Sequence, residues 1–472
     1  MPIAQNTTPA DLFTFMAAKP WAMWLDSCNS NHVDSRFDIL VWQADATLTT
    51  FGKNTHIENN SSASVIVSQD DPLSLLENLQ DEVVGKVESN HDFLPFLGGA
   101  LGYFSYDLGR RFEKLPERAQ QDINLPDMAI GIYSQAIIYD NKSGNFYLIC
   151  PQDKRHNIEQ WLQEQLSKNK LTTANHDNFS LTTPWQANMD KVSYFEKFNQ
   201  VQDYLLSGDC YQINLAQRFS AQYRGDEFQA YLALRTANQA PFSAFIRLKD
   251  SAILSISPER FLQCRQKKVQ SKPIKGTLAR SNDPIQDKEN ARILAASTKD
   301  RAENLMIVDL LRNDISKSCI AGSVKVPKLF DIESFPAVHH LVSTVEGTIA
   351  ENKQATDLLR GAFPGGSITG APKIRAMEII EELEPHRRSV YCGSIGYISR
   401  CGTMDTSITI RTLVCHSDPT LPDKQLHCWA GGGLVADSTA ASEYQETFDK
   451  VNCILPILTK LGSNTIKPSE KE

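Results

Sequence analysis

Short segments with the period-two pattern of β-strands recur along this chain, and helical patterns stand between groups of them. The pattern is clearest in five segments: Phe37–Trp42, Ala136–Asp140, Tyr211–Phe219, Ala252–Ser257 and Cys392–Ile398. Strands that are grouped between helices, rather than alternating with them singly, are typical of antiparallel sheets. The sequence therefore predicts an α+β fold built on large antiparallel β-sheets.

A polar stretch near the middle of the chain predicts a domain boundary. Residues 171–190 are rich in polar side chains and indicate a solvated linker. A helix is predicted directly after it, over Ser193–Leu206, because Ser193 and Glu196 have the spacing of a capping box. We therefore expect an N-terminal domain over residues 1–185 and a second domain over residues 190–460.

The composition argues against several classes of partner. Of the 472 residues, 41% are hydrophobic and 22% are charged, which is typical of a globular protein with room for a large core. The net charge is −8 and no basic run occurs, so nucleic acid is not an expected partner. No apolar stretch is long enough to span a bilayer, so no membrane association is expected.

The N-terminus and the cysteines predict the compartment. The first residues lack the basic and apolar regions of a signal peptide. The ten cysteines are scattered without a C-x-x-C pair, which argues against a zinc site or a disulfide framework. We therefore expect the chain to work in the reducing cytoplasm.

Two pairs of acidic residues have a spacing that places each pair on one face of a helix. Asp300 and Glu303 are three residues apart in a predicted helix, and Glu443 and Glu446 repeat this spacing in another. A solvated acidic face gives the same pattern, but apolar residues indicate that both helices are partly buried. Two such helices could hold one hard cation, because Mg²⁺ takes one or two protein carboxylates together with water and substrate oxygens.

Lys275 is the strongest single candidate for chemistry. It lies in the stretch Ser271–Thr277, between an apolar residue and a glycine, and the flanks of the stretch resemble strands. Most lysines lie on solvated surfaces. Here Gly276 allows the backbone to approach a ligand closely, and Pro273 indicates a fixed, partly buried mount. The acidic helices and a glycine loop follow in the chain and can complete a site around Lys275.

Six motifs occur in one order along the chain, namely Pro273–Thr277, Glu303–Asp314, Gly370–Lys373, Asp405–Arg411, Gly431–Ser438 and Glu443–Thr447. Together they resemble the chorismate-utilising enzymes. The resemblance is strong over residues 190–460 and looser before them. It implies a sandwich of large antiparallel β-sheets flanked by helices, with chorismate as the substrate and Mg²⁺ as the cofactor.

The resemblance also assigns the acidic residues. It implies that Glu303 and Glu446 are direct Mg²⁺ ligands. Asp300 and Glu443 would act through water or orient the direct ligands.

Other motif residues would bind the two carboxylates of chorismate, of which Mg²⁺ would hold the ring carboxylate. By resemblance, Arg411 offers a planar fork to the enolpyruvyl carboxylate, and Tyr391 donates a hydrogen bond to the same group. The glycines Gly431, Gly432 and Gly433 would supply backbone N–H groups in a nest, although a tight turn explains three glycines equally well.

Four further residues match positions around the family's active site. Glu259 corresponds to the general acid that protonates the C4 hydroxyl, although a glutamate in a surface turn fits the local sequence as well. His340 corresponds to an active-site histidine, and a single histidine of this kind is by default a core contact. Ser367 corresponds to a hydroxyl that faces the active site. Thr277 ends the lysine motif and is included among the substrate-binding residues.

Two positions distinguish branches of the family. Gln212 occupies the position of a lysine that activates water in isochorismate and salicylate synthases, and a glutamine cannot act as a general base. Lys275 stands where anthranilate synthases have alanine. The resemblance then implies that Lys275 attacks C2 of chorismate while Glu259 protonates the departing C4 hydroxyl. Ammonia would next attack C4 and expel Lys275, giving 4-amino-4-deoxychorismate.

The source of ammonia and two alternative functions stay open in the sequence. No Gly-x-Cys-x-Gly glutaminase motif is present, so ammonia is expected from solution or from a separate glutamine amidotransferase subunit in a heterodimer. The alternatives are a synthase that makes anthranilate and a catalytically silent regulator that binds chorismate. Trp24–Ser27 resembles a tryptophan-binding segment of anthranilate synthases, but Asp26 replaces a glutamate and one leucine is absent.

Overall fold

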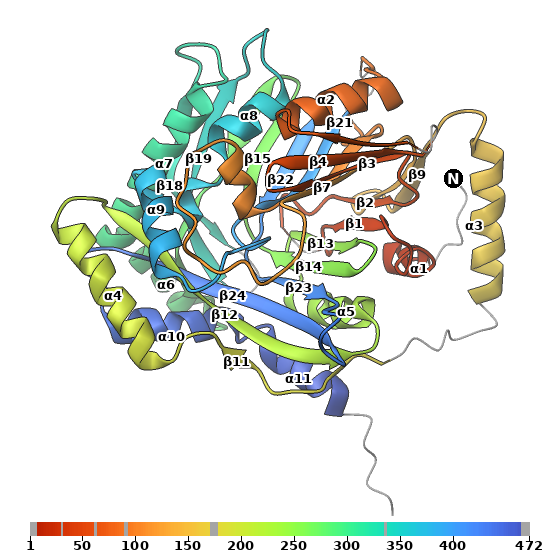
Figure 1. The fold of residues 1–472 in the computed structure, drawn as a ribbon. Coiled ribbons are helices and arrows are strands. Elements are labelled where there is room, and N and C mark those ends of the chain that lie inside the picture. Colours follow the sequence, from red (N-terminus) through yellow and green to blue (C-terminus); the bar gives the residue numbers. More distant parts are fainter. Residues whose placement is uncertain are drawn as a thin grey trace, which may run out of the picture.

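Two large antiparallel sheets form the body of the protein. The computed structural model describes residues 7–29, 32–60, 64–88, 93–169, 178–334 and 338–463. Within these residues each sheet has twelve strands, and helices surround the pair (Figure 1). The predicted α+β class with large antiparallel sheets is confirmed.

The first sheet, sheet A, contains the long pair β12 and β24. Its strand order is β10 (Ser180–Leu181), β12 (Gln212–Arg224), β24 (Lys424–Leu434), β23 (Thr412–His416), β14 (Ser251–Ser257), β13 (Phe242–Arg247), β1 (Met23–Asp26), β2 (Phe37–Val41), β8 (Ala136–Asp140) and β9 (Asn145–Ile149). Two short strands also pair with β12, namely β11 (Gln186–Ala187) and β20 (Gly370–Ala371).

The second sheet, sheet B, begins at the strand that carries Lys275. Its order is β17 (Ile274–Ala279), β19 (Val338–Thr348), β16 (Lys268–Ser271), β15 (Arg260–Arg265), β22 (Met404–Ile408), β21 (Ser394–Ser399), β6 (Gly99–Phe104), β7 (Met128–Tyr133), β3 (Ala46–Phe51), β4 (Asn54–Asn59) and β5 (Ser64–Ser68). Strand β18 (Lys325–Ser334) pairs with β19.

The helices lie on the outer sides of the sheets. They are α1 (Pro9–Thr14), α2 (Pro72–Val83), α3 (Arg155–Asn169), α4 (Lys191–Leu206), α5 (Glu227–Asn238), α6 (Pro284–Ala296), α7 (Thr298–Ser316), α8 (Ala355–Ala362), α9 (Lys373–Leu383), α10 (Ala440–Val451) and α11 (Leu455–Ser463), with 3-10 turns η1 (Tyr106–Arg111) and η2 (Gly366–Ile368). Figure 1 shows α4, α10 and α11 beneath the long strands β12 and β24.

The main apolar core lies between the sheets and makes them a sandwich. It joins Ile39 and Ile246 of sheet A to Leu101 and Tyr103 of sheet B, all of which are buried. A second core covers the outer face of sheet A, where helices α1, α5 and α11 bury the opposite faces of its strands. This arrangement follows from strands whose two faces are both apolar.

All five predicted strands are confirmed, but two predictions near the middle of the chain need correction. The helix predicted at Ser193 begins earlier, at Lys191, because the Asp190 side chain accepts a hydrogen bond from the Ser193 backbone N–H and caps it. The predicted linker is wrong for its second part, because β10 and β11 pair with β12. Residues 171–177 of that linker lie outside the described residues.

Strands from both sides of the predicted domain boundary occur in both sheets. In sheet A, β1 pairs with β13, and in sheet B, β6 pairs with β21. The segments 1–185 and 190–460 therefore share one sandwich, and the boundary between them stays a prediction about the sequence. All ten cysteines lie in described residues and have free thiols. The described helices include none with the length and apolar character that a membrane crossing needs.

Candidate active site

Lys275 lies on β17, the first strand of sheet B, at a break in the pairing with β19. The register shifts between Lys275 and Thr277. Gly276 at this bulge has a φ of 71°, and a Cβ there would lie 2.8 Å from the Cγ of Asp300. Both facts require glycine at this position. The bulge places Asp300, in the first turn of α7, against the strand that presents the lysine.

The surroundings of Lys275 favour its neutral form. The side chain is half-buried, and burial lowers its pKa from the ordinary range, with a further decrease from the positive charge of Lys450. The acidic groups of Glu303, Glu259 and Glu446 act in the opposite direction without reversing the shift. A lowered pKa makes the free amine, which is the nucleophilic form, more abundant near neutral pH.

Glu259 is buried between β14 and β15, so the surface-turn interpretation of this residue is wrong. Only 8% of it is exposed, and its carboxylate accepts a hydrogen bond of 3.0 Å from the Ser367 hydroxyl. Burial raises the pKa of Glu259 to about 7, although Ser367 and the charges of Lys275 and Lys450 each lower it. A carboxyl group with this pKa can donate a proton near neutral pH.

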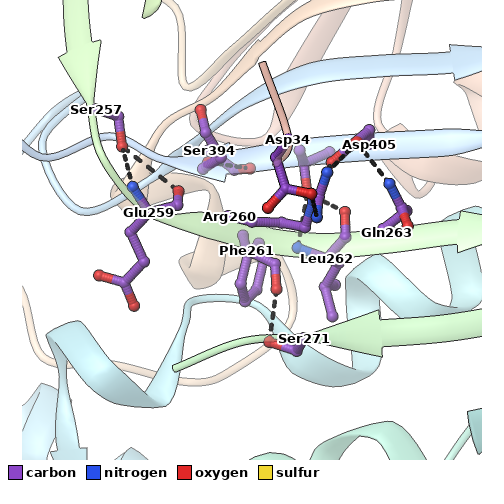
Figure 2. A network of polar contacts seen from close by, with 12 residues as sticks. Asp34, Ser257, Glu259, Arg260, Phe261, Leu262, Gln263, Ser271, Ser394 and Asp405 are labelled. Carbon is purple, nitrogen blue, oxygen red and sulfur yellow. Dashed lines mark hydrogen bonds and ion pairs between the residues drawn. The ribbon is translucent and has the colours of Figure 1, made fainter. Parts of the chain in front are cut away.

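The backbone of Glu259 is held by Ser257, whose hydroxyl donates to the Ile408 carbonyl across 2.6 Å and accepts from the Glu259 N–H. Figure 2 shows the Glu259 side chain directed away from Arg260, its neighbour in the chain. Arg260 instead forms ion pairs with Asp405 and Asp34, at 2.9 and 2.8 Å. The side chains of Glu259 and Arg260, which are adjacent in the chain, thus point to opposite sides of the strand (Figure 2).

The acidic pairs occupy α7 and α10, as predicted. Glu443 is buried, its Oε1 accepts a hydrogen bond of 2.7 Å from Ser438, and its Oε2 has no partner within the described residues. A Cβ on Gly432 would lie 2.9 Å from that Oε2 and 3.3 Å from Oε1 of Glu446. The missing side chain of Gly432 therefore lets both carboxylates lie close to the β24 backbone.

Glu303 belongs to the same electrostatic cluster. Burial raises its pKa, and the charges of Asp300 and Glu446 add to the increase while Lys275 opposes it. The described residues contain no group of three or more histidine, cysteine or acidic side chains arranged to hold a metal ion. Mg²⁺ takes only one or two protein carboxylates, so a magnesium site does not require such a group.

The glycines of the predicted nest lie in a regular strand, so the nest interpretation is wrong. Gly431, Gly432 and Gly433 belong to β24 and pair in register with β12. A nest needs successive N–H groups on one side, whereas those of a strand alternate. Gly433 serves a different purpose, because a Cβ there would lie 2.0 Å from the side-chain nitrogen of Gln212.

Gln212 is buried at the start of β12, and its side-chain oxygen has no hydrogen-bond partner in the described residues. An unpaired buried acceptor costs about 1–3 kcal/mol, so it calls for a donor from a ligand or water. Tyr391, which follows α9 in the chain, is also buried. Its ring stacks on Trp429 with an interplanar angle of 7°.

His340 and Arg411 lie close enough for their charges to interact. Burial lowers the pKa of His340 to about 4, and the positive charge of Arg411 lowers it further. The His340 ring and the Thr277 hydroxyl form a hydrogen bond of 2.8 Å between β19 and β17. His340 is therefore neutral near pH 7. Its hydrogen bond to Thr277 joins β19 to β17, the strand that carries Lys275.

Lys450 is a site residue that the sequence analysis missed. Its ammonium group forms an ion pair of 2.7 Å with Glu446 and donates to the Gly431 carbonyl, also at 2.7 Å. Its charge acts on the pKa of Lys275, Glu259 and Glu443. The spacing of Glu446 and Lys450, four residues apart on one helix, is the signal that could have found it.

The segment that resembles a tryptophan site lies away from these residues, beside a separate cavity of about 220 Å³. Leu25, Asp26 and Ser27 line this cavity together with Arg260. The Asp26 carboxylate is already satisfied, because it accepts hydrogen bonds from Tyr231 and Arg235.

Comparisons with known proteins agree with this architecture. The family model described as chorismate binding enzyme matches residues 22–456. The chain is 56% identical to aminodeoxychorismate synthase component 1 of Escherichia coli, over 95% of each chain. It is 37% identical to anthranilate synthase component 1 of Thermus thermophilus, over 80% of this chain and 81% of the relative.

A solved structure extends the comparison to three dimensions. Anthranilate synthase component I from Streptococcus pneumoniae superimposes with a TM-score of 0.77 at 30% identity, covering 90% of this chain and 93% of the other. The family model covers most of the sequence, and the sandwich and the site follow the order of its motifs. The chain therefore belongs to the family of chorismate binding enzymes.

Proposed function

We propose that this protein is the synthase component that converts chorismate and ammonia to 4-amino-4-deoxychorismate, an amino-group transfer on the route to p-aminobenzoate and folate. The observation that carries the proposal is the pairing of Lys275, whose pKa is lowered, with Glu259, whose pKa is about 7. The 56% identical relative bears the corresponding name. These two groups are the nucleophile and the acid that displacement of a hydroxyl needs.

The first half-reaction uses the free amine of Lys275. Its nitrogen forms a bond to C2 of the ring, the two conjugated ring double bonds shift toward C4, and the C4–O bond breaks. Glu259 gives its proton to the departing hydroxyl, which leaves as water, so Glu259 becomes a carboxylate and the lysine nitrogen becomes a cation. Burial and Lys450 favour this step because both lower the pKa of Lys275 and so favour its free amine.

Ammonia completes the second half-reaction. It attacks C4, the two ring double bonds shift back, and the bond between C2 and Lys275 breaks to release the neutral amine. The new ammonium group returns one proton to Glu259, which restores the starting state. Gln212 fits this step, because its unpaired oxygen can accept a hydrogen bond but cannot remove a proton from water.

Mg²⁺ fits the carboxylate cluster. Glu303 and Glu446 would hold it directly, while Glu443 and Asp300 would orient its water ligands. The unpaired Oε2 of Glu443, and the approach of the Glu443 and Glu446 carboxylates to one position at Gly432, support this assignment. When bound, the ion would supply positive charge for the ring carboxylate of chorismate. Arg411 and Tyr391 would bind the second carboxylate, beside the β24 glycines.

A second component is part of the proposal. The named relative is a component 1, so we assign the supply of ammonia to a separate glutamine amidotransferase subunit in a heterodimer. The ten free cysteines suit a reducing cytoplasm, where we place the reaction.

The test is a product analysis. Purified protein, chorismate, Mg²⁺ and ammonium should give 4-amino-4-deoxychorismate, identified by mass and chromatographic retention. Anthranilate as the main product would overturn the proposal in favour of the function named for the 37% identical relative. Binding of chorismate without turnover would favour the silent regulator instead.

The covalent role of Lys275 has its own test. Without ammonia, chorismate and Mg²⁺ should leave a ring adduct on Lys275, visible by intact-protein mass spectrometry and located by peptide mapping. The Lys275→Ala variant should lose the adduct and most of the activity. If wild type shows no adduct and its rate falls as pH rises through the lysine pKa, Lys275 acts as a cation.

A further inference from the structure

Strand β5 ends sheet B with an apolar stretch that the rest of the described chain leaves exposed. Val65, Ile66 and Val67 are 62%, 57% and 54% exposed. Successive side chains of a strand point to opposite faces, so apolar side chains lie exposed on both faces of β5. The strand pairs on one side only, with β4.

This edge lacks the features that commonly prevent edge strands from pairing. Its five residues include no proline and no charged side chain, and its register with β4 is regular from Thr55↔Ser68 to Asn59↔Ser64, without a bulge. Natural edge strands usually carry such features because an open edge invites pairing with another strand. The free side of β5 is therefore suited to accept one more strand.

The sequence of β5 identifies that strand. Ser64–Ser68 reads Ser-Val-Ile-Val-Ser in both directions, so it is symmetric about Ile66. Two copies that pair antiparallel around a twofold axis at Ile66 place this residue opposite itself and each Val65 opposite Val67 of the other copy. Every central pair is then apolar, and no charge within the strand opposes a like charge. We propose that β5 is a self-association site, at which two copies of this chain join their B sheets edge to edge.

The active site stays free in such a dimer. Lys275 lies on β17, which pairs with the same side of β19 as β16 does and so lies eight strand spacings from β5. At about 4.8 Å per spacing this is about 38 Å along the sheet. Self-association through β5 therefore leaves α7, α10 and the substrate groups open.

The contact is short, which sets its strength. Five residues span about 17 Å, and the paired edge buries less than the roughly 1,600 Å² of a standard stable interface. The dimer is therefore a weak one, whose population rises with protein concentration. Sedimentation velocity over a series of concentrations should show wild type passing from monomer to dimer.

The twofold geometry gives a sharp test at Ile66, which is exposed and outside the site. Ile66→Lys and Ile66→Glu each place a like charge opposite itself and should weaken association about tenfold or more. An equimolar mixture of the two variants should associate again, because lysine then faces glutamate. Leu206→Lys, at an exposed residue that ends α4, is the control and should dimerise like wild type.

Each outcome decides the proposal. A wild type that stays monomeric at every concentration would overturn it, and so would a lysine and glutamate mixture that fails to associate. Association that appears only after the amidotransferase subunit is added would assign the edge to that partner instead. Activity per chain should be the same for wild type and the Ile66 variants.

Discussion

Ser367 donates a hydrogen bond of 3.0 Å to the carboxylate of Glu259. The contact joins η2, which follows α8, to the acid that precedes β15. Because the hydroxyl donates to the ionised carboxylate, it stabilises that form and lowers the pKa of Glu259, while burial raises it to about 7. The protonation of Glu259 therefore depends on the balance between burial and this hydrogen bond, and one substitution can change that balance.

Ser367→Ala should move the alkaline limb of the pH–rate profile to higher pH. Without the hydroxyl the pKa of Glu259 rises above about 7, so the protonated acid persists at higher pH. The measurement is kcat/KM for chorismate between pH 6 and 9. Ser271→Ala is a matched control, because that hydroxyl donates to the Phe261 carbonyl instead. An unchanged limb would show that Glu259 is not the acid that titrates.

Glu259→Gln should abolish turnover and stabilise the fold at alkaline pH. The pKa of Glu259 is raised from 4.5 to about 7 in the folded protein, so its stabilising effect is complete below pH 4.5 and is lost as pH rises through 7. At pH 8 the buried charge costs on the order of 3 kcal/mol, which the neutral amide removes. Urea denaturation at pH 5 and pH 8 measures the difference. The exposed Glu351→Gln serves as the control, and a pH-independent effect of Glu259→Gln would contradict the raised pKa.

Lys450→Met should move the acidic limb of the pH–rate profile upward. The positive charge of Lys450 lowers the pKa of Lys275, so its removal raises that pKa and makes the free amine scarcer at a given pH. Lys450→Arg keeps the charge and should keep the limb near its wild-type position. If the two variants have the same profile, the charge of Lys450 does not act on the nucleophile.

Gly432→Ala should weaken Mg²⁺ binding. The added methyl group would lie 2.9 Å from Oε2 of Glu443 and 3.3 Å from Oε1 of Glu446, so both carboxylates must move. We expect the dissociation constant, measured by calorimetry with Mg²⁺ alone, to rise about tenfold or more. Unchanged Mg²⁺ affinity would mean that the ion, if bound, lies away from Gly432.

The sequence predicted well those features that depend on one residue type in a local pattern. The acidic pairs lie on helices as their spacing indicated, and Lys275 lies on a strand with Gly276 at a bulge. The family resemblance also singled out Glu259, whose burial no local pattern reveals, because Ser257 and Pro258 are equally typical of a surface turn.

The failures concern features that distant segments impose. Gly431–Gly433 form a strand because β12 pairs with them, and no local signal separates such a strand from a nest. Lys450 was missed because its spacing from Glu446 says nothing about Lys275, and only the folded protein places its charge near that residue. One failure was local instead: the start of α4 was misplaced because Asp190 and Ser193 are both good caps, and the structure uses Asp190.

Because strands from the two halves of the chain pair with each other, some strands near the N-terminus can find their partners only late in synthesis. Leu25 pairs with Ala244 on the neighbouring strand, and Gly99 pairs with Ser399. A growing chain on the ribosome thus adds 219 residues after Leu25 and 300 residues after Gly99 before these partners are made. Such distant pairings fold slowly and leave apolar strand edges exposed meanwhile. The N-terminal half depends on the C-terminal half for its closure, so a truncated chain should have little chance of folding alone.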